Sequence, residues 1–268
     1  MEEGALLNSA GEGGAAALDL PVTCRGRLDT VRAAWSGRGM RRLVLWDIDR
    51  TLINGGKVGR DVFVAAYLAV VGSEPPRLPE FGGRTDHWIF TTALEWHGRE
   101  VNPELVAEFF THLAEHTRAH RPQLLARGAA LTGAAQALAA LSVETGVVQS
   151  VVTGNIREAA YEKLSAFGLL GPIDLEVGGY GCDDGVRSVL VRLAHERAQA
   201  KYAATLPARQ VVVIGDTPHD IEAARANGAI AIGVATGSCT ADELAEAGAD
   251  VVLPSLADTA TVLRAVLT

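Results

Sequence analysis

Cysteines are few in this sequence, and none lies close to another. The 268 residues contain three, Cys24, Cys182 and Cys239, an odd number with no CxxC spacing. Such a set offers neither a disulfide framework nor a paired zinc motif, so we expect reduced thiols and a cytoplasmic protein. Long apolar runs are also lacking, because no stretch reaches the ~20 apolar residues that a membrane-spanning helix needs. The sequence therefore predicts no membrane partner.

Positive charge is the second shortage. The chain has 24 Lys and Arg residues against 32 Asp and Glu residues, which gives a net charge of -8. Proteins that bind nucleic acid normally carry a basic patch or stripe, so we expect no nucleic-acid partner. Hydrophobic residues make up 48% of the chain, enough for a large core in one domain or in a domain with an insert.

Residues 1–39 lack the features of a folded start. They are rich in Gly, Ala and Glu, and they have neither the basic start nor the compact apolar block of a secretory signal. We predict a disordered N-terminal extension, with at most a short helix at 27–36. The folded domain is predicted to begin at Met40.

From Met40 onward, apolar β-branched segments alternate with helical patterns. This alternation is typical of a doubly wound, Rossmann-like α/β fold, in which a parallel sheet has helices on both faces. We predict that this core comprises residues 40–56 and 127–268. Its expected strands are 43–46, 147–152, 211–214, 230–234 and 250–253.

The segment between the first two expected strands is too long for an ordinary crossover. We therefore predict that residues 57–126 form an inserted small α-helical cap domain. Because the insert leaves the core just after the first strand, it is positioned to close over groups at the strand ends. The expected cap helices are 61–71, a second capped by Thr85 and running to Trp96, and a third opened by Asn102 and Pro103 and running towards His120.

Two aspartates, Asp47 and Asp49, directly follow the first expected strand. Ligands of open parallel sheets bind beyond the carboxyl ends of the strands. Side chains two residues apart in extended chain also share a face. Two like charges held this close repel each other, so the pair implies a cation or a shared proton. The sequence predicts a metal at this position and, with it, phosphate chemistry.

Two later strand ends supply groups that suit the same chemistry. Thr153, Gly154 and Asn155 combine a hydroxyl, a glycine that allows close approach and a helix N-terminus, which together suit a phosphate group. Asp216 and Asp220 add two carboxylates at the same edge of the sheet. Mg²⁺ prefers oxygen ligands and keeps water and substrate phosphate in its shell. We predict a Mg²⁺ site at which these four acids converge.

A cation of the protein is also needed, to offset charge on a transferring phosphoryl group. Arg187 opens a helix after a loop, and Lys201 near the end of that helix is the other candidate. We favour Arg187, because a residue at a helix N-terminus can face the crevice.

The segments DIDRTL (47–52), VVTGN (151–155), a basic residue that opens a helix, and GDTPHD (215–220) occur in this order. This series resembles the haloacid dehalogenase superfamily of Mg-dependent phosphohydrolases. The helical insert resembles the cap of its phosphoglycolate phosphatase-like and β-phosphoglucomutase-like members. The resemblance covers nearly everything from Met40 to the C-terminus.

The resemblance implies roles for the residues that match. The sequence departs from the family's pattern at Arg50, where glycine is usual, and at Arg187, where lysine followed by proline is usual. The implied roles are nucleophile for Asp47, general acid and base for Asp49, phosphoryl binding for Thr153 and Arg187, and holding or orienting Mg²⁺ for Asp216 and Asp220.

The resulting hypothesis is Mg-dependent hydrolysis of a phosphomonoester through an aspartyl phosphate on Asp47. Asp49 argues against dehalogenation, because a departing halide needs no proton. A small cap favours a small phosphorylated metabolite as the substrate. Two alternatives stay open, a phosphosugar mutase of the β-phosphoglucomutase type and a catalytically silent binding module of the same fold. A monomer and a homodimer are equally compatible with the sequence.

Within the cap, the turn GGRTD (82–86) is the segment best suited to contact a leaving group, because loops on rigid scaffolds often carry function. We predict substrate contacts for Arg84 and Thr85. Histidines recur every four residues in the third cap helix, a spacing that can bind metal, but a solvated helix face is the commoner outcome. Aromatic residues in a small helical bundle are more often core than pocket lining. These further candidates are His112, His116 and His120, and Trp88, Phe90 and Trp96.

Overall fold

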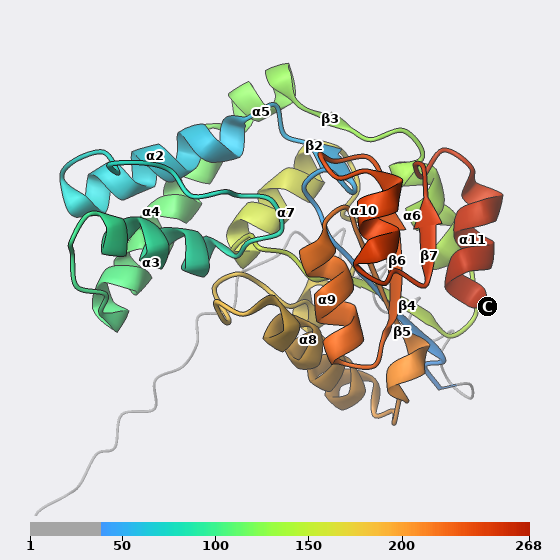
Figure 1. Ribbon diagram of the computed structural model, residues 1–268. Coiled ribbons are helices and arrows are strands. Elements are labelled where there is room, and N and C mark those ends of the chain that lie inside the picture. Colours follow the sequence, from blue (N-terminus) through green and yellow to red (C-terminus); the bar gives the residue numbers. More distant parts are fainter. Residues whose placement is uncertain (1–38) are drawn as a thin grey trace, which may run out of the picture. The chain divides into compact units, whose positions relative to one another are not determined.

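The computed structural model describes residues 39–268, which contain a five-stranded parallel sheet flanked by helices (Figure 1). The strand order is β4-β1-β5-β6-β7, so the first strand in the sequence lies between two later ones. This is the predicted doubly wound α/β fold. Except for Gly39, the expected N-terminal extension and its short helix lie outside the described residues.

The strands form where the sequence is apolar and β-branched. In β1 the last four residues are buried, and all of β5 is buried, as expected for parallel strands covered on both faces. The observed strands agree with the predicted ones to within one residue at each end. They are β1 (Arg42–Trp46), β4 (Val147–Val151), β5 (Val211–Gly215), β6 (Ile230–Val234) and β7 (Val251–Leu253).

The register of the central strands aligns their carboxyl ends. Trp46, the last residue of β1, lies opposite Val151 of β4 and opposite Ile214 of β5. The segments that follow these three strands therefore begin at the same edge of the sheet. This alignment brings the three predicted motifs together.

Helices cover both faces of the sheet. On one face α6 (Ala134–Ser142) packs against α11 (Thr259–Leu267), and on the other α8 (Arg187–Tyr202) packs against α9 (Pro218–Ala226). Right-handed crossovers place the helices in this way. The other elements of the core are α7 (Arg157–Ala166), α10 (Ala241–Glu246) and two short 3-10 helices, η1 (Leu175–Val177) and η2 (Ala208–Gln210).

The chain leaves and re-enters the core through a small antiparallel pair that the sequence did not predict. In it β2 (Ile53–Asn54) pairs with β3 (Ala129–Ala130). The helices between the two strands confirm the three expected ones and add a short fourth. They are α2 (Val58–Val71), α3 (Asp86–Trp96), α4 (Pro103–Ala119) and α5 (Arg121–Arg127).

Two of these helices start at the residues that the sequence indicated. The Thr85 side chain accepts a hydrogen bond from the Trp88 backbone N–H, and Asn102 accepts one from Leu105. Each bond satisfies a backbone donor that a helix start leaves unpaired. Local capping chemistry is thus sufficient to set these two boundaries.

The helices α2 to α4 supply most of a second hydrophobic cluster, to which Leu124 of α5 and Ile156 and Ala159 at the start of α7 also belong. Phe90 and Phe109 stack in it with ring centroids 3.9 Å apart, and Phe63 meets Phe109 edge to face. Phe90 is therefore core, whereas Trp96 is 38% exposed beneath the Arg77 guanidinium. Most of this second cluster comes from residues 57–126, and the interpretation of this range as a cap stays a prediction. In residues 39–268, no helix has the length and apolar character needed to cross a membrane.

Candidate active site

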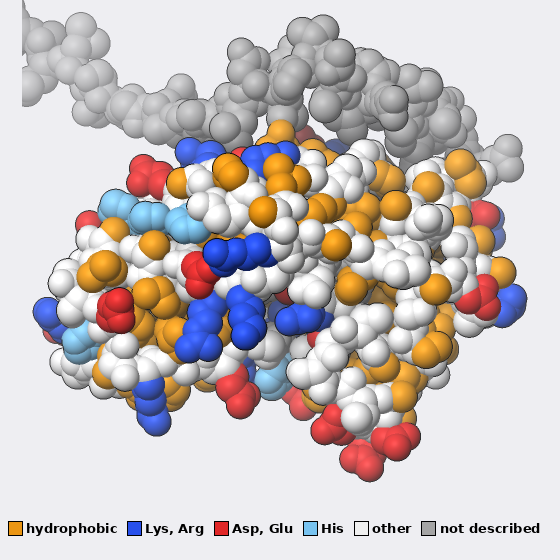
Figure 2. All heavy atoms as spheres, turned by 90° about the horizontal axis from the view of Figure 1, so that it is seen from above, with side chains coloured by type: hydrophobic (Ala, Val, Ile, Leu, Met, Phe, Trp, Pro, Cys, Tyr) orange, Lys and Arg blue, Asp and Glu red, His pale blue; other side chains and the backbone are white. Residues whose placement is uncertain are grey.

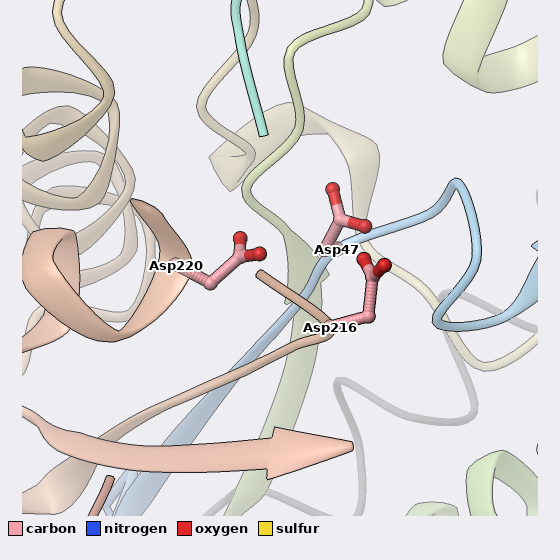
Figure 3. A group of neighbouring side chains, drawn as sticks. All are labelled: Asp47, Asp216 and Asp220. Atoms are coloured by element: carbon pink, nitrogen blue, oxygen red, sulfur yellow. The ribbon is translucent and has the colours of Figure 1, made fainter. Parts of the chain in front are cut away.

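Three buried aspartates meet at the carboxyl edge of the sheet. Asp47 follows β1, Asp216 follows β5, and Asp220 lies in the first turn of α9. One carboxylate oxygen from each lies within 4.8 Å of the others. Figure 3 shows the Asp47 and Asp216 carboxylates close together, with Asp220 turned towards them. The structure thus brings together three of the four predicted acids as one cluster.

Arg187 bridges two members of this cluster. Its Nη2 lies 2.6 Å from Asp47 Oδ1, and its Nε donates to Asp220 Oδ1 at 2.9 Å. Nη1 donates to the backbone oxygen of Gly83, which precedes the cap helix α3. Burial opposes the positive charge, but the two aspartates outweigh it and raise the pKa of Arg187. Lys201 instead binds Asp174 through Nζ, so Arg187 is the one of the two predicted cations that reaches these acids.

The Asp216 carboxylate has no such basic partner in the described contacts. Thr51 Oγ1 donates to Asp47 Oδ2 at 3.2 Å and approaches Asp216 Oδ1 at 3.4 Å. Burial is the main cause that raises the pKa of both acids, to about 7 for Asp47 and about 8 for Asp216, and repulsion between the acids adds to it. One guanidinium therefore does not compensate three buried carboxylates. Their oxygen donors and excess negative charge fit a divalent cation such as Mg²⁺.

Asp49 has different partners from this cluster. Lys163 Nζ lies 2.8 Å from its Oδ1 and 2.6 Å from its Oδ2, and Asn155 Nδ2 donates to Oδ2 at 2.7 Å. Burial alone would raise the pKa of Asp49, but Lys163 and Asn155 together hold it below the usual value. The predicted metal set included Asp49. Its carboxylate lies outside the three-aspartate cluster and binds Lys163 and Asn155, and a part for Asp49 in a metal site stays a prediction.

Lys163 was not among the predicted site residues. It lies in α7, on the same buried face as Ala159, Ala160 and Leu164. A sequence signal was present: a lysine at a helical spacing where apolar residues face the sheet, in the helix that follows Thr153. Thr51, four residues after Asp47, was not predicted as a hydrogen-bond partner, because a residue in a turn shows no periodicity.

The predicted phosphate cradle is a tight turn. Thr153 is fully buried, and its Oγ1 accepts hydrogen bonds from the backbone N–H and the side-chain Nδ2 of Asn155. The backbone of Gly154 contacts the cap, because its carbonyl accepts from the Asp86 N–H at 2.7 Å. Asp86 Oδ2 accepts in turn from the Ile156 N–H at the start of α7. One donor of the cradle is therefore already paired with a carboxylate of the cap.

The two predicted cap contacts differ in their surroundings. Thr85 is 1% exposed, and its hydroxyl donates to the Gly185 carbonyl while it accepts from Trp88. Both hydrogen-bonding roles of this hydroxyl are used within the protein, and its contact with a substrate stays a prediction. The Arg84 guanidinium lies over the Trp88 ring, 4.3 Å from the centroid. A substrate contact for Arg84 stays a prediction.

Arg50 has a backbone conformation that glycine adopts more readily. Its φ is 68°, in the left-handed region that favours glycine. The turn is held by hydrogen bonds from the Arg50 N–H to the Ile53 carbonyl and from Thr236 Oγ1 to the Arg50 carbonyl. Arg50 therefore occupies, in the turn after Asp49, a conformation that suits the glycine usual at this position.

His112 and His116 of α4 and His120 at its C-cap are all partly exposed. Figure 2 shows a row of histidine side chains, in pale blue, on one face of the molecule. The ring centroids of His112 and His116 are 6.5 Å apart, and those of His116 and His120 are 6.2 Å apart. Among the described residues, the group able to place three ligands around one ion is the aspartate cluster, not these histidines. The solvated helix face that we favoured agrees with this geometry.

Comparisons with known proteins agree with this arrangement. The model of the haloacid dehalogenase-like hydrolase family matches residues 44–225. A phosphoglycolate phosphatase from Yersinia pseudotuberculosis is 26% identical over 224 residues, which cover 81% of this chain and 90% of that protein. The resemblance inferred from the motifs is confirmed.

Solved structures show the same fold. A hydrolase from Pseudomonas syringae has 21% identity and a TM-score of 0.61, and the match covers 84% of this chain and 98% of that one. A predicted phosphatase from Clostridium acetobutylicum has 19% identity and a TM-score of 0.62, with 84% and 99% covered. At these identities the structural matches support the fold alone.

Removal of divalent cations should make the fold sensitive to alkaline pH. The raised pKa values of Asp47 and Asp216 mean that their contribution to the stability of the metal-free fold is largest below their ordinary pKa of about 4 and is lost progressively as the pH rises to about 7 to about 8. We expect the melting temperature in EDTA to fall between about pH 5 and about pH 8 and to change little from these acids above that. Mg²⁺ should raise it by roughly 3 °C or more at the alkaline end and hardly at the acid end.

The variant Asp216→Asn is the control for this measurement. It removes one of the repelling charges, so its melting temperature in EDTA should change less with pH. It should also lose most of the stabilisation by Mg²⁺. A Mg²⁺ effect as large as that of the wild type would contradict the assignment of the cation to this cluster.

The contact between the cradle and the cap predicts a strong effect of Gly154→Ala. A Cβ at this position would overlap the backbone oxygen of Arg84, so the cap turn or the cradle must move. We expect destabilisation by about 1–3 kcal/mol in urea unfolding. Binding of inorganic phosphate, measured by calorimetry, should weaken at least about tenfold, because phosphate contacts depend on backbone position. Gly171→Ala is the matched control, since nothing lies within 4 Å of its Cβ position; equal effects in both variants would refute the contact's importance.

Proposed function

The chain belongs to the haloacid dehalogenase-like hydrolase family, and we propose that it is a Mg²⁺-dependent phosphatase that hydrolyses small phosphomonoesters through an aspartyl phosphate on Asp47. One observation carries the proposal. Two carboxylates two residues apart are held in different ways, Asp47 buried between Arg187 and Thr51, and Asp49 half exposed beside Lys163. This difference suits a nucleophile and a proton-transfer group.

In the first half of the reaction, Asp47 attacks phosphorus and the bond to the leaving oxygen breaks. Oδ2 lies on the side of Asp216, which suits it to hold the cation, so Oδ1 is the oxygen that forms the new bond. Arg187 Nη2, 2.6 Å from Oδ1, then lies beside the transferring group and offsets its charge. Asp49 in its protonated form donates a proton to the leaving oxygen.

In the second half, water attacks the phosphorus of the aspartyl phosphate. Asp49 takes the proton from this water, the bond to Asp47 breaks, and inorganic phosphate leaves. Lys163 and Asn155 favour the charged form of Asp49, which is the form that accepts a proton. Mg²⁺, held by Asp47 and Asp216, would reduce the charge repulsion between the phosphoryl oxygens and Asp47.

The leaving group enters from the side of the cap. The turn before α3 contacts the cradle through Gly154 and contacts Arg187 through Gly83, so the site lies beneath a small helical domain. This arrangement favours a small metabolite. The curated relative from Yersinia is named a phosphoglycolate phosphatase, so phosphoglycolate belongs in any first set of substrates. The cytoplasmic location and the oligomeric state stay predictions.

Phosphate release from a panel of esters tests the proposal. We expect release from at least one small ester, dependence on Mg²⁺, and loss of at least about 10³-fold in Asp47→Asn, because that variant lacks the nucleophile. Brief reaction with a ³²P-labelled ester should label the wild-type protein, and hydroxylamine should remove the label, as it does for acyl phosphates. Asp47→Asn should carry no label.

The matched control is Asp61→Asn, which removes an exposed acid paired with Arg127 and should leave the rate unchanged. Release that persists in EDTA or in Asp47→Asn would refute the mechanism. Phosphoprotein that transfers its group to a sugar phosphate without free phosphate would identify a mutase instead. Absence of both label and release for every ester would support the silent binding module.

A further inference from the structure

Lys163 is a buried cation at a position that does not need one for packing. It is 8% exposed and lies among Ala159, Ala160 and Leu164 on the inner face of α7. Lysines are seldom buried unless they are paired, because removing the charge from water is costly. A buried ion pair also adds little stability compared with an apolar side chain of similar size. The reason for this lysine therefore lies in its contacts.

Those contacts use every proton of the ammonium group. Nζ donates to Asp49 Oδ1 at 2.8 Å, to Asp49 Oδ2 at 2.6 Å and to Asn155 Oδ1 at 2.6 Å. Asn155 closes the arrangement, since its Nδ2 donates both to Asp49 Oδ2 and to Thr153 Oγ1 at 2.7 Å. The Asp49 carboxylate is thereby tied to the turn that forms the phosphate cradle.

The two oxygens of Asp49 are not equivalent in this arrangement. Oδ2 accepts from both Lys163 and Asn155, whereas Oδ1 accepts from Lys163 alone. The Asp49 side chain is 44% exposed, and that of Lys163 is 10% exposed. The space beside Oδ1 is bordered by Gly55, whose Cβ position would lie 3.7 Å from that atom. Oδ1 is therefore the oxygen with room for a further partner.

We propose that Lys163 is a positioning residue for Asp49: together with Asn155 it holds the carboxylate by both oxygens, so that Oδ1 meets the leaving oxygen of the ester and later the attacking water. The inference rests on the proposed phosphatase function. A carboxyl group that transfers protons must be held within a fraction of an ångström of its productive position. Contacts to both oxygens remove the rotation that one contact would leave free.

A purely structural pairing of Lys163 with the cap is the competing explanation. Asp86, at the start of α3, is the other acid whose charge interacts with Lys163. Its Oδ2, however, accepts from the Ile156 N–H, while Lys163 directs its protons to Asp49 and Asn155. These hydrogen bonds therefore favour Asp49 as the group on which Lys163 acts.

The test uses the different need for proton donation by two kinds of ester. An alkyl phosphate releases a strongly basic alkoxide and depends on Asp49, whereas p-nitrophenyl phosphate releases a stable phenolate that needs no proton. The ratio kcat/KM covers the steps up to departure of the leaving group. For Lys163→Met we expect kcat/KM to fall by about 100-fold with the alkyl ester and by less than about 5-fold with the aryl ester.

A double-mutant cycle shows whether Lys163 acts through Asp49. Asp49→Asn should show the same dependence on the leaving group. Adding Lys163→Met to Asp49→Asn should then reduce kcat/KM for the alkyl ester by less than about threefold further, because the group being positioned is already lost. Additive losses in the double variant would overturn the proposal.

A loss of folding in the variants must be distinguished from a loss of positioning. Asp49 is half exposed and can be solvated without its partner, and the double variant removes both charges of the pair, so both variants should keep a cooperative melting transition. Lys201→Met is the matched control, since it removes a lysine bound to Asp174 far along α8, and it should leave both kcat/KM values unchanged.

Each outcome has one meaning. If the wild type is active and Lys163→Met loses equal activity with the two esters, Lys163 has a structural role. This outcome overturns the positioning role of Lys163 and leaves the proposed phosphatase function standing. An active wild type with no loss in Lys163→Met overturns it as well. A wild type that releases phosphate from neither ester and from no other member of the panel overturns the proposed function and this inference with it.

Discussion

The repulsion between carboxylates at one edge of the sheet is the constraint on which the rest of this structure depends. Parallel strands end together, so the acids that follow β1 and β5 are forced close to one another in a buried place. Burial raises the pKa of Asp47 and Asp216, and each added carboxylate makes the next more costly to ionise. The fold is compatible with these groups because other elements bring cations and hydroxyls to the same edge.

Two helices supply these cations, and they divide the acids between them. Arg187 at the start of α8 forms ion pairs with Asp47 and Asp220, and Lys163 within α7 forms one with Asp49. Neighbouring carboxylates therefore acquire opposite shifts, since the pKa of Asp47 is raised and that of Asp49 is lowered. Different environments for two similar acids are how a protein gives them different chemical roles.

The cap is attached to the same groups rather than to a separate surface. Its turn before α3 meets Gly154 of the cradle and accepts a hydrogen bond from Arg187 through Gly83, while Asp86 pairs with the start of α7. The cap thus touches the proposed phosphate cradle, the start of α7 and the arginine that pairs with Asp47. These hydrogen bonds join the turn before α3 directly to the groups at the carboxyl edge of the sheet.

The sequence by itself determined the sheet, the helical insert and the candidate acids, because these depend on local patterns: apolar β-branched segments, capping residues such as Asn102, and polar groups placed directly after a strand. Only the tertiary structure decided between Arg187 and Lys201. They lie at opposite ends of α8, about 20 Å apart at 1.5 Å per residue, and only the N-terminal end reaches the sheet edge. Thr85 is polar and lies in a turn, yet both of its hydrogen bonds go to the protein. Lys163 contacts Asp49 although the two residues are 114 positions apart in the sequence. This contact depends on which face of α7 packs inward, and no local sequence pattern predicts it.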